Sequence, residues 1–162
     1  MTRQRGFTDE ERGAWAPFAA LLELLPHEID AQLVRDEGIT HFDYFAMAVL
    51  RRAPGHTMRA SELASHTSAT LPRMSHALKR LEARGFVERA PAADDARATQ
   101  VTLTYEGRRK VIGSTPSHVE NVRNLVLDAL TEEQKGQLQE IVRAILPRVD
   151  PDARMAATRG EM

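Results

Sequence analysis

Cysteine is absent from this chain of 162 residues. Without thiols the protein has no disulfide bonds, no thiolate metal ligands and no thiol-based redox switch. Any signal that it senses must therefore act through other groups.

Long hydrophobic runs are absent as well. The longest, residues 14–22, is much shorter than the roughly 20 apolar residues that cross a bilayer. Residues 1–12 are mostly polar and lack the apolar core of a secretory signal. We therefore expect a cytoplasmic protein with no membrane partner.

Net charge is small, at −1, but the two signs are unevenly distributed. Residues 54–110 carry ten Lys and Arg against six Asp and Glu, a local charge of +4, and the rest of the chain carries −5. Affinity for phosphate depends on local charge, so a basic centre is what a nucleic-acid-binding protein needs. Uneven sampling alone would produce the same distribution, so the charge leaves both interpretations open.

Apolar residues recur at spacings of three and four along most of the chain, which predicts amphipathic helices. The helices are expected at residues 14–35, 41–52, 60–66, 70–84, 105–130 and 131–146. Pro26 and Pro116 lie inside two of these patterns and predict a kink or a break in each helix. Pro147 and Pro151 mark the end of the predicted folded region, and residues 152–162 are expected to be frayed.

Two short β-prone segments, residues 86–89 and 99–104, flank a polar loop and predict a two-stranded hairpin. Two short helices joined by a tight turn and followed by such a hairpin form a winged helix-turn-helix. The fold class is thus mainly α with a small β-hairpin. We assign residues 37–107 to a DNA-binding domain, 1–36 and 108–150 to a helical dimerisation region, and 151–162 to a tail. The terminal helices carry longer apolar stripes than one small core can bury, which favours a homodimer.

The helix predicted at residues 70–84 buries one apolar stripe and leaves a basic, hydroxyl-rich face outward, as a helix in the major groove of double-stranded DNA requires. The predicted DNA contacts from this helix and the turn before it are Ser68, Thr70, Arg73, Ser75, His76, Lys79 and Arg80. The predicted contacts from the hairpin, or wing, are Arg89, Asp95 and Arg97. Arg97 is expected to enter the minor groove, with its guanidinium donating a bidentate hydrogen bond to the carboxylate of Asp95. A solvated amphipathic helix and an ordinary surface ion pair are the alternatives.

Four segments, in this order along the chain, carry a resemblance to a known family. They are Ser-Glu-Leu-Ala at 61–64, Leu-Glu-Ala-Arg-Gly-Phe-Val-Glu-Arg at 81–89, Asp-Ala-Arg at 95–97 and Val-Thr-Leu-Thr-Tyr-Glu-Gly at 101–107. Together they resemble the MarR (multiple antibiotic resistance regulator) family of bacterial repressors. The resemblance implies a homodimer on a pseudo-palindromic operator, and transcription regulation, with repression as the expected outcome.

The same resemblance implies release from DNA by a small aromatic or phenolic ligand, bound where the dimerisation helices meet the DNA-binding domain. The candidate pocket residues, which combine aromatic surface with polar groups, are Trp15, His27, His41, Tyr44 and Arg52. Trp15 and Tyr44 are better explained as core or dimer-interface residues, and His41 as a residue at the start of its helix. The chain also departs from the family pattern, since His76 and Ala96 stand where the family often has arginine. These replacements weaken non-specific phosphate binding, and His76 makes DNA affinity sensitive to pH near neutrality.

An enzyme and a protein-binding module are the two other classes of function for a chain of this kind. The six histidines form no His-Glu-x-x-His pattern, and the chain has no glycine-rich phosphate loop and no nucleophile elbow. We therefore expect no enzyme activity, no cofactor and no metal site. A winged-helix module that binds protein instead of DNA is the second alternative, and the local charge of +4 together with Arg97 argues against it.

Overall fold

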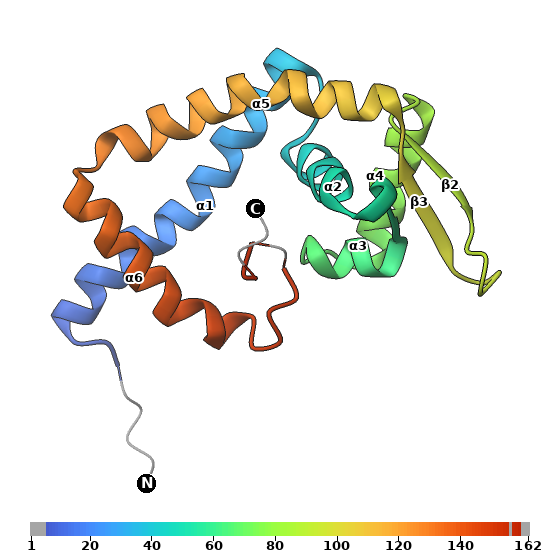
Figure 1. The fold of residues 1–162 in the computed structure, drawn as a ribbon. Helices are drawn as coiled ribbons and strands as arrows, with labels where there is room; N and C mark the ends of the chain where they lie inside the picture. Colours follow the sequence, from blue (N-terminus) through green and yellow to red (C-terminus); the bar gives the residue numbers. More distant parts are fainter. Residues whose placement is uncertain (1–5, 156, 160–162) are drawn as a thin grey trace, which may run out of the picture.

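The computed structural model describes residues 6–155 and 157–159 (Figure 1). Its helices are α1 (Asp9–Glu37), α2 (His41–Arg52), α3 (Ala60–His66), α4 (Leu71–Ala83), α5 (Tyr105–Leu125) and α6 (Glu132–Val149). Two short 3₁₀ turns, η1 (Pro54–His56) and η2 (Leu127–Ala129), and three strands, β1 (Thr57–Arg59), β2 (Val87–Pro91) and β3 (Thr99–Leu103), complete the fold. None of the helices in these described ranges is long and apolar enough to cross a membrane. The prediction of a mainly helical winged helix-turn-helix is confirmed.

Side-chain caps explain where several helices begin. The Thr8 hydroxyl accepts the backbone N–H of Glu11, whose carboxylate accepts that of Thr8, and Thr131 and Gln134 form the same reciprocal capping box at α6. A kink or a break was predicted at Pro26 and Pro116; the break does not occur, since α1 and α5 each continue through their proline, and the kink stays a prediction. A proline removes one helical N–H donor, and the packing of α1 against α5 holds the flanking turns in place.

The sheet is antiparallel with strand order β1-β3-β2. The predicted two-stranded hairpin is confirmed as β2 and β3, and β1 adds a third strand that the sequence did not predict. Thr57 of β1 pairs with Thr102 of β3, and their hydroxyls lie 2.9 Å apart. Three residues show no clear alternation in the sequence, so β1 is defined only by its partner strand.

One apolar core lies under α4 and fixes its orientation. Its fully buried members come from the end of α1, from α2 to α4, from the sheet and from α5: Leu33, Met47, Leu50, Leu63, Met74, Leu78, Leu81, Val87, Val101 and Val111. Helix α4, called the recognition helix below, and the wing therefore pack on the same core, which fixes the position of their outer faces relative to each other.

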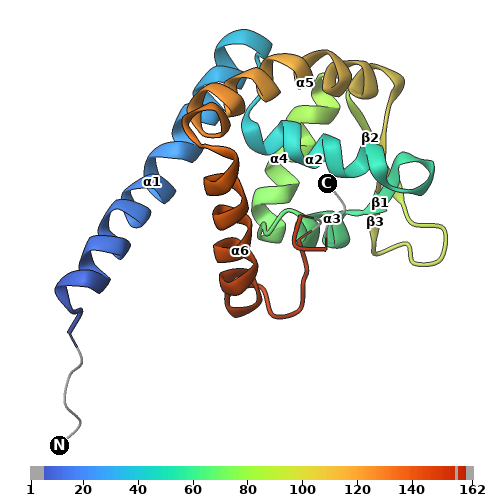
Figure 2. The ribbon, with the colours of Figure 1, turned by 60° about the vertical axis from the view of Figure 1, so that its left-hand side comes forward.

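The terminal helices contrast with this core. Figure 2 shows the N-terminal part of α1 extending away from the winged helix region, whereas the C-terminal end of α6 approaches α3, where Leu146 and Val149 line a pocket with Ala64 and Ser65. Trp15 and Leu22 of α1 are 48% and 53% exposed, and Ile141 of α6 is 54% exposed. The apolar stripes predicted on these segments therefore remain uncovered within one chain.

Candidate nucleic-acid interface

Helix α4 presents the polar face that the sequence predicts. Thr70 caps the helix by accepting the backbone N–H of Arg73, and Pro72 lies in the first turn, where its missing N–H costs nothing. Arg73, Ser75, His76 and Lys79 are exposed, whereas Met74, Ala77, Leu78 and Leu81 are buried. Ser68 is exposed in the preceding turn with a left-handed φ of 50°.

Two arginines of α4 are held by consecutive residues of α2. The Arg73 guanidinium lies 4.3 Å from the centroid of the Phe42 ring. The Arg80 guanidinium donates to the buried carboxylate of Asp43 at 2.8 Å. Arg80 was predicted as an outward DNA contact, and its side chain is half exposed but tied to α2. These contacts position the recognition helix in addition to any contact with DNA.

The Asp43–Arg80 ion pair leads to a stability prediction. Arg80→Met is expected to lower the free energy of unfolding by about 3 kcal/mol, because it leaves a buried carboxylate without a partner. Adding Asp43→Asn should restore most of this loss, because the uncompensated charge is then removed. Urea denaturation at one fixed protein concentration measures both effects. If Arg80→Met and the double variant had the same free energy of unfolding, the charges of Asp43 and Arg80 would not be coupled.

The loop of the wing joins β2 to β3, and the Arg97 side chain in this loop is exposed. The Asp95 carboxylate accepts the backbone N–H of Arg97 at 3.0 Å. The predicted side-chain pair between these two residues is not formed in the part of the chain that the structure describes, because an aspartate two residues away reaches the backbone amide first. Asp94 instead pairs with Arg59 of β1, which ties the wing tip to the sheet.

Arg89 was predicted as a second wing contact. The structure pairs its guanidinium with the carboxylate of Glu82 on α4. Hydrogen bonding from Arg89 lowers the pKa of Glu82, and the same contact raises the pKa of Arg89. The pair connects strand β2 to helix α4. No local sequence pattern indicates this contact, because it depends on how β2 packs against α4.

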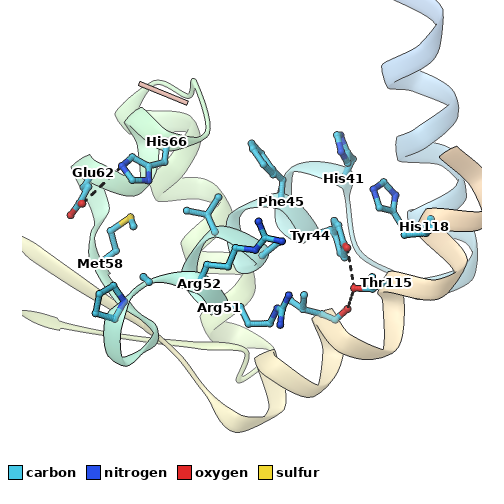
Figure 3. Close-up of a pocket in the computed structure, with 16 residues that line it drawn as sticks. His41, Tyr44, Phe45, Arg51, Arg52, Met58, Glu62, His66, Thr115 and His118 are labelled. Atoms are coloured by element: carbon cyan, nitrogen blue, oxygen red, sulfur yellow. Dashed lines mark hydrogen bonds and ion pairs between the residues drawn. The ribbon is translucent and has the colours of Figure 1, made fainter. Parts of the chain in front are cut away.

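A cavity of about 550 Å³ opens between α2, α3 and α5 (Figure 3). His41, Tyr44 and Arg52, three of the five predicted pocket residues, line it. Trp15 and His27 do not, since both lie on the exposed part of α1. Helical spacing from His41 and Tyr44 could have added Phe45 and Ala48, which also line the wall. Thr115 and His118 come from α5, and only the packing of α5 against α2 brings them there.

A basic, exposed helix beside a wing, both fixed to one core, defines a winged helix-turn-helix DNA-binding protein. Comparison with known proteins agrees. Residues 38–98 match the MarR family. The chain is 36% identical to Sco3205, a MarR family transcriptional regulator from Streptomyces coelicolor whose crystal structure was determined in complex with DNA. That alignment covers 91% of this chain and 92% of that one, with a TM-score of 0.84.

Two further relatives agree with this match. AbsC, a MarR family transcriptional regulator from the same organism, is 30% identical, with a TM-score of 0.83 and coverage of 90% of this chain and 98% of that one. The transcriptional repressor MprA of Escherichia coli is 28% identical over 74% of this chain and 67% of its own length. The chain belongs to the MarR family and is a DNA-binding transcriptional regulator.

Proposed function

We propose that the protein is a transcriptional repressor that binds a pseudo-palindromic operator as a homodimer. The observation that carries this proposal is the exposed face of α4 with Arg73, His76 and Lys79, placed beside the exposed Arg97 of the wing. A helix of this kind reads base edges in the major groove, while the wing arginine is suited to the minor groove. A protein-interaction module would not need cations at both places.

The homodimer is supported by the uncovered apolar side chains of the terminal helices. Those on α1 and α6 include Trp15, Phe18, Leu21, Leu22, Leu138, Ile141 and Ile145. Large exposed apolar patches of this kind mark interaction surfaces. A two-fold pairing of these helices would give two recognition helices related by the symmetry of a palindromic site.

Release by a small aromatic or phenolic ligand is supported by the position of α2. One face of this helix lines the cavity with His41 and Tyr44, and adjacent positions hold two arginines of α4 through Phe42 and Asp43. A ligand that prefers a different position of α2 would therefore move the recognition helix, and only such a differential preference can regulate. Regulation, not catalysis, is the proposed activity. The proposed compartment is the cytoplasm, which holds the chromosome of the bacteria from which the named relatives come.

Selection of bound sequences from random double-stranded DNA tests the proposal. We expect a consensus with two inverted half-sites, because each protomer contributes one recognition helix. Sedimentation of the free protein at the same concentration should give the mass of two chains. Failure to enrich any sequence would refute sequence-specific regulation.

A further inference from the structure

Leu71, the first residue of α4, is 59% exposed. The spacing of residues 71, 74, 78 and 81 predicts one buried apolar stripe along this helix. Met74, Leu78 and Leu81 are buried as predicted, but the prediction was wrong for Leu71, whose side chain lies outside the core. An apolar side chain is therefore exposed at the start of the recognition helix.

Leu71 is an exception within the winged helix region. The structure describes all of residues 38–104, and Leu71 is the only large apolar side chain among them that is exposed. The other exposed large apolar side chains lie before residue 38 or after residue 104, mainly on α1, α5 and α6. Pairing of the terminal helices in a dimer therefore does not account for Leu71. A single exposed leucine is ordinary on a protein surface, so its place in the DNA-binding site decides what it can do.

The turn before α4 holds Leu71 in a fixed position. The hydroxyl of the buried Thr67 donates to the Leu63 carbonyl oxygen of α3 at 2.8 Å. The Ala69 backbone N–H donates to the Ala64 carbonyl oxygen, also at 2.8 Å. The first turn of α4 is thereby tied to α3. A side chain presented from such a position loses less entropy when it makes a contact.

Leu71 lies on one edge of the outward face of α4. Ser75 follows it by four positions, so the two residues share a helical face, and both are exposed. Arg73 follows by two positions, and side chains with this spacing point in nearly opposite directions. The Arg73 guanidinium rests on the ring of Phe42 from α2. Leu71 and Ser75 therefore form the edge of the DNA-binding face that lies away from Arg73.

The first two residues of α4 have no polar group in their side chains. Leu71 and Pro72 cannot form side-chain hydrogen bonds, although N-terminal residues of a recognition helix contact base edges in the major groove. The apolar feature of that groove is the C5 methyl group of thymine, which the other three standard bases lack. An exposed leucine at this position therefore matches thymine.

We propose that Leu71 contacts the C5 methyl group of one thymine in each half-site and makes the operator specific for thymine at that position. The proposal deepens the DNA binding of the proposed function and rests on it. The contact removes apolar surface of the leucine and of the methyl group from water without forming a hydrogen bond. It therefore distinguishes thymine from uracil, which differs only in lacking the methyl group.

Replacement of thymine by deoxyuridine tests this contact, because it removes the methyl group and nothing else. Each symmetry-related pair of thymines in the selected operator is replaced in turn, and the full-length chain is titrated onto the labelled DNA. At one pair we expect affinity to fall on the order of tenfold, since two buried methyl groups are lost. Fluorescence anisotropy at one salt concentration measures the change.

Variants assign the methyl contact to the leucine. In Leu71→Ala, operators with thymine and with deoxyuridine at that pair should bind within about twofold of each other, because the methyl group has lost its partner. Ile112→Ala is the matched control, since it removes a side chain from α5 that is also 59% exposed. This control should keep the preference for thymine. A purely structural role of Leu71 would weaken binding to both operators equally and leave the preference in place.

Three results would overturn the proposal. They are selected half-sites without thymine, deoxyuridine that binds as well as thymine at every pair, and a preference for thymine that Leu71→Ala leaves unchanged. Each of these results leaves sequence-specific regulation intact, because selection has then enriched an operator. Failure to enrich any sequence would instead refute the proposed function, and this proposal with it.

Discussion

Replacing Arg73 and Arg97 together by alanine is expected to lower operator affinity on the order of 1000-fold. Each protomer would lose one guanidinium from α4 and one from the wing, so the dimer loses four. At about 1 kcal/mol each, the low end for arginine contacts to bases, the sum is about 4 kcal/mol, or roughly a thousandfold in Kd. Both side chains are exposed, and the stacking of Arg73 on Phe42 is the one packing contact described above that is lost, so the variant should still fold and dimerise.

A matched variant separates specific contact from loss of charge. Arg35→Ala with Arg123→Ala removes the same number of cations from α1 and α5, where the side chains are 67% and 62% exposed. We expect this variant to bind within about threefold of the unmodified chain at the same salt concentration, because its charges lie away from the proposed DNA contacts. Anisotropy measures both variants, and equal losses would show that net charge alone governs binding.

Gly107→Ala is expected to lower the free energy of unfolding by about 3 kcal/mol, at the upper end for overpacking. A Cβ at Gly107 would lie 2.1 Å from the Phe86 carbonyl oxygen and 2.7 Å from Cδ1 of Leu103. That carbonyl cannot move easily, since it accepts hydrogen bonds from the backbone N–H and the hydroxyl of Thr104. The first turn of α5 would therefore have to shift away from the sheet.

Gly113→Ala is the control in the same helix. A Cβ there meets nothing within 4 Å, so this variant should gain roughly 0.5–1 kcal/mol from helix propensity. Urea denaturation at one protein concentration compares the two. A Gly107→Ala variant as stable as Gly113→Ala would contradict the close approach of α5 to the sheet.

Local sequence signals predicted much of the fold. The expected bounds of α2 and α3 agree with the structure, because apolar spacing, the Thr40 cap and the Pro54-Gly55 stop all act within a few residues. Strand β1 was missed because its three residues become a strand only by pairing with β3.

Local signals also predicted which face of α4 lies outward, but not the ion-pair partners of Arg80 and Arg89. The spacing of Met74, Leu78 and Leu81 determines which face of α4 is buried, and hence which residues lie outward. The partners of Arg80 and Arg89 depend on how α2 and β2 pack on α4, which no local pattern reveals. In the cavity, aromatic character suggested Trp15, whereas His118 lies on α5 and follows the first residue of α2 by 77 positions in the sequence.

Hydroxyl-radical footprinting on the selected operator tests the central claim most directly. Paired recognition helices and wings predict two protected segments about 10 bp apart from centre to centre, related by the two-fold axis of the site. Arg97→Ala should remove the minor-groove protection at the two wings and leave the major-groove contacts in place. A single protected segment, or protection that Arg97→Ala leaves unchanged, would contradict a dimer that reads DNA with both α4 and the wing.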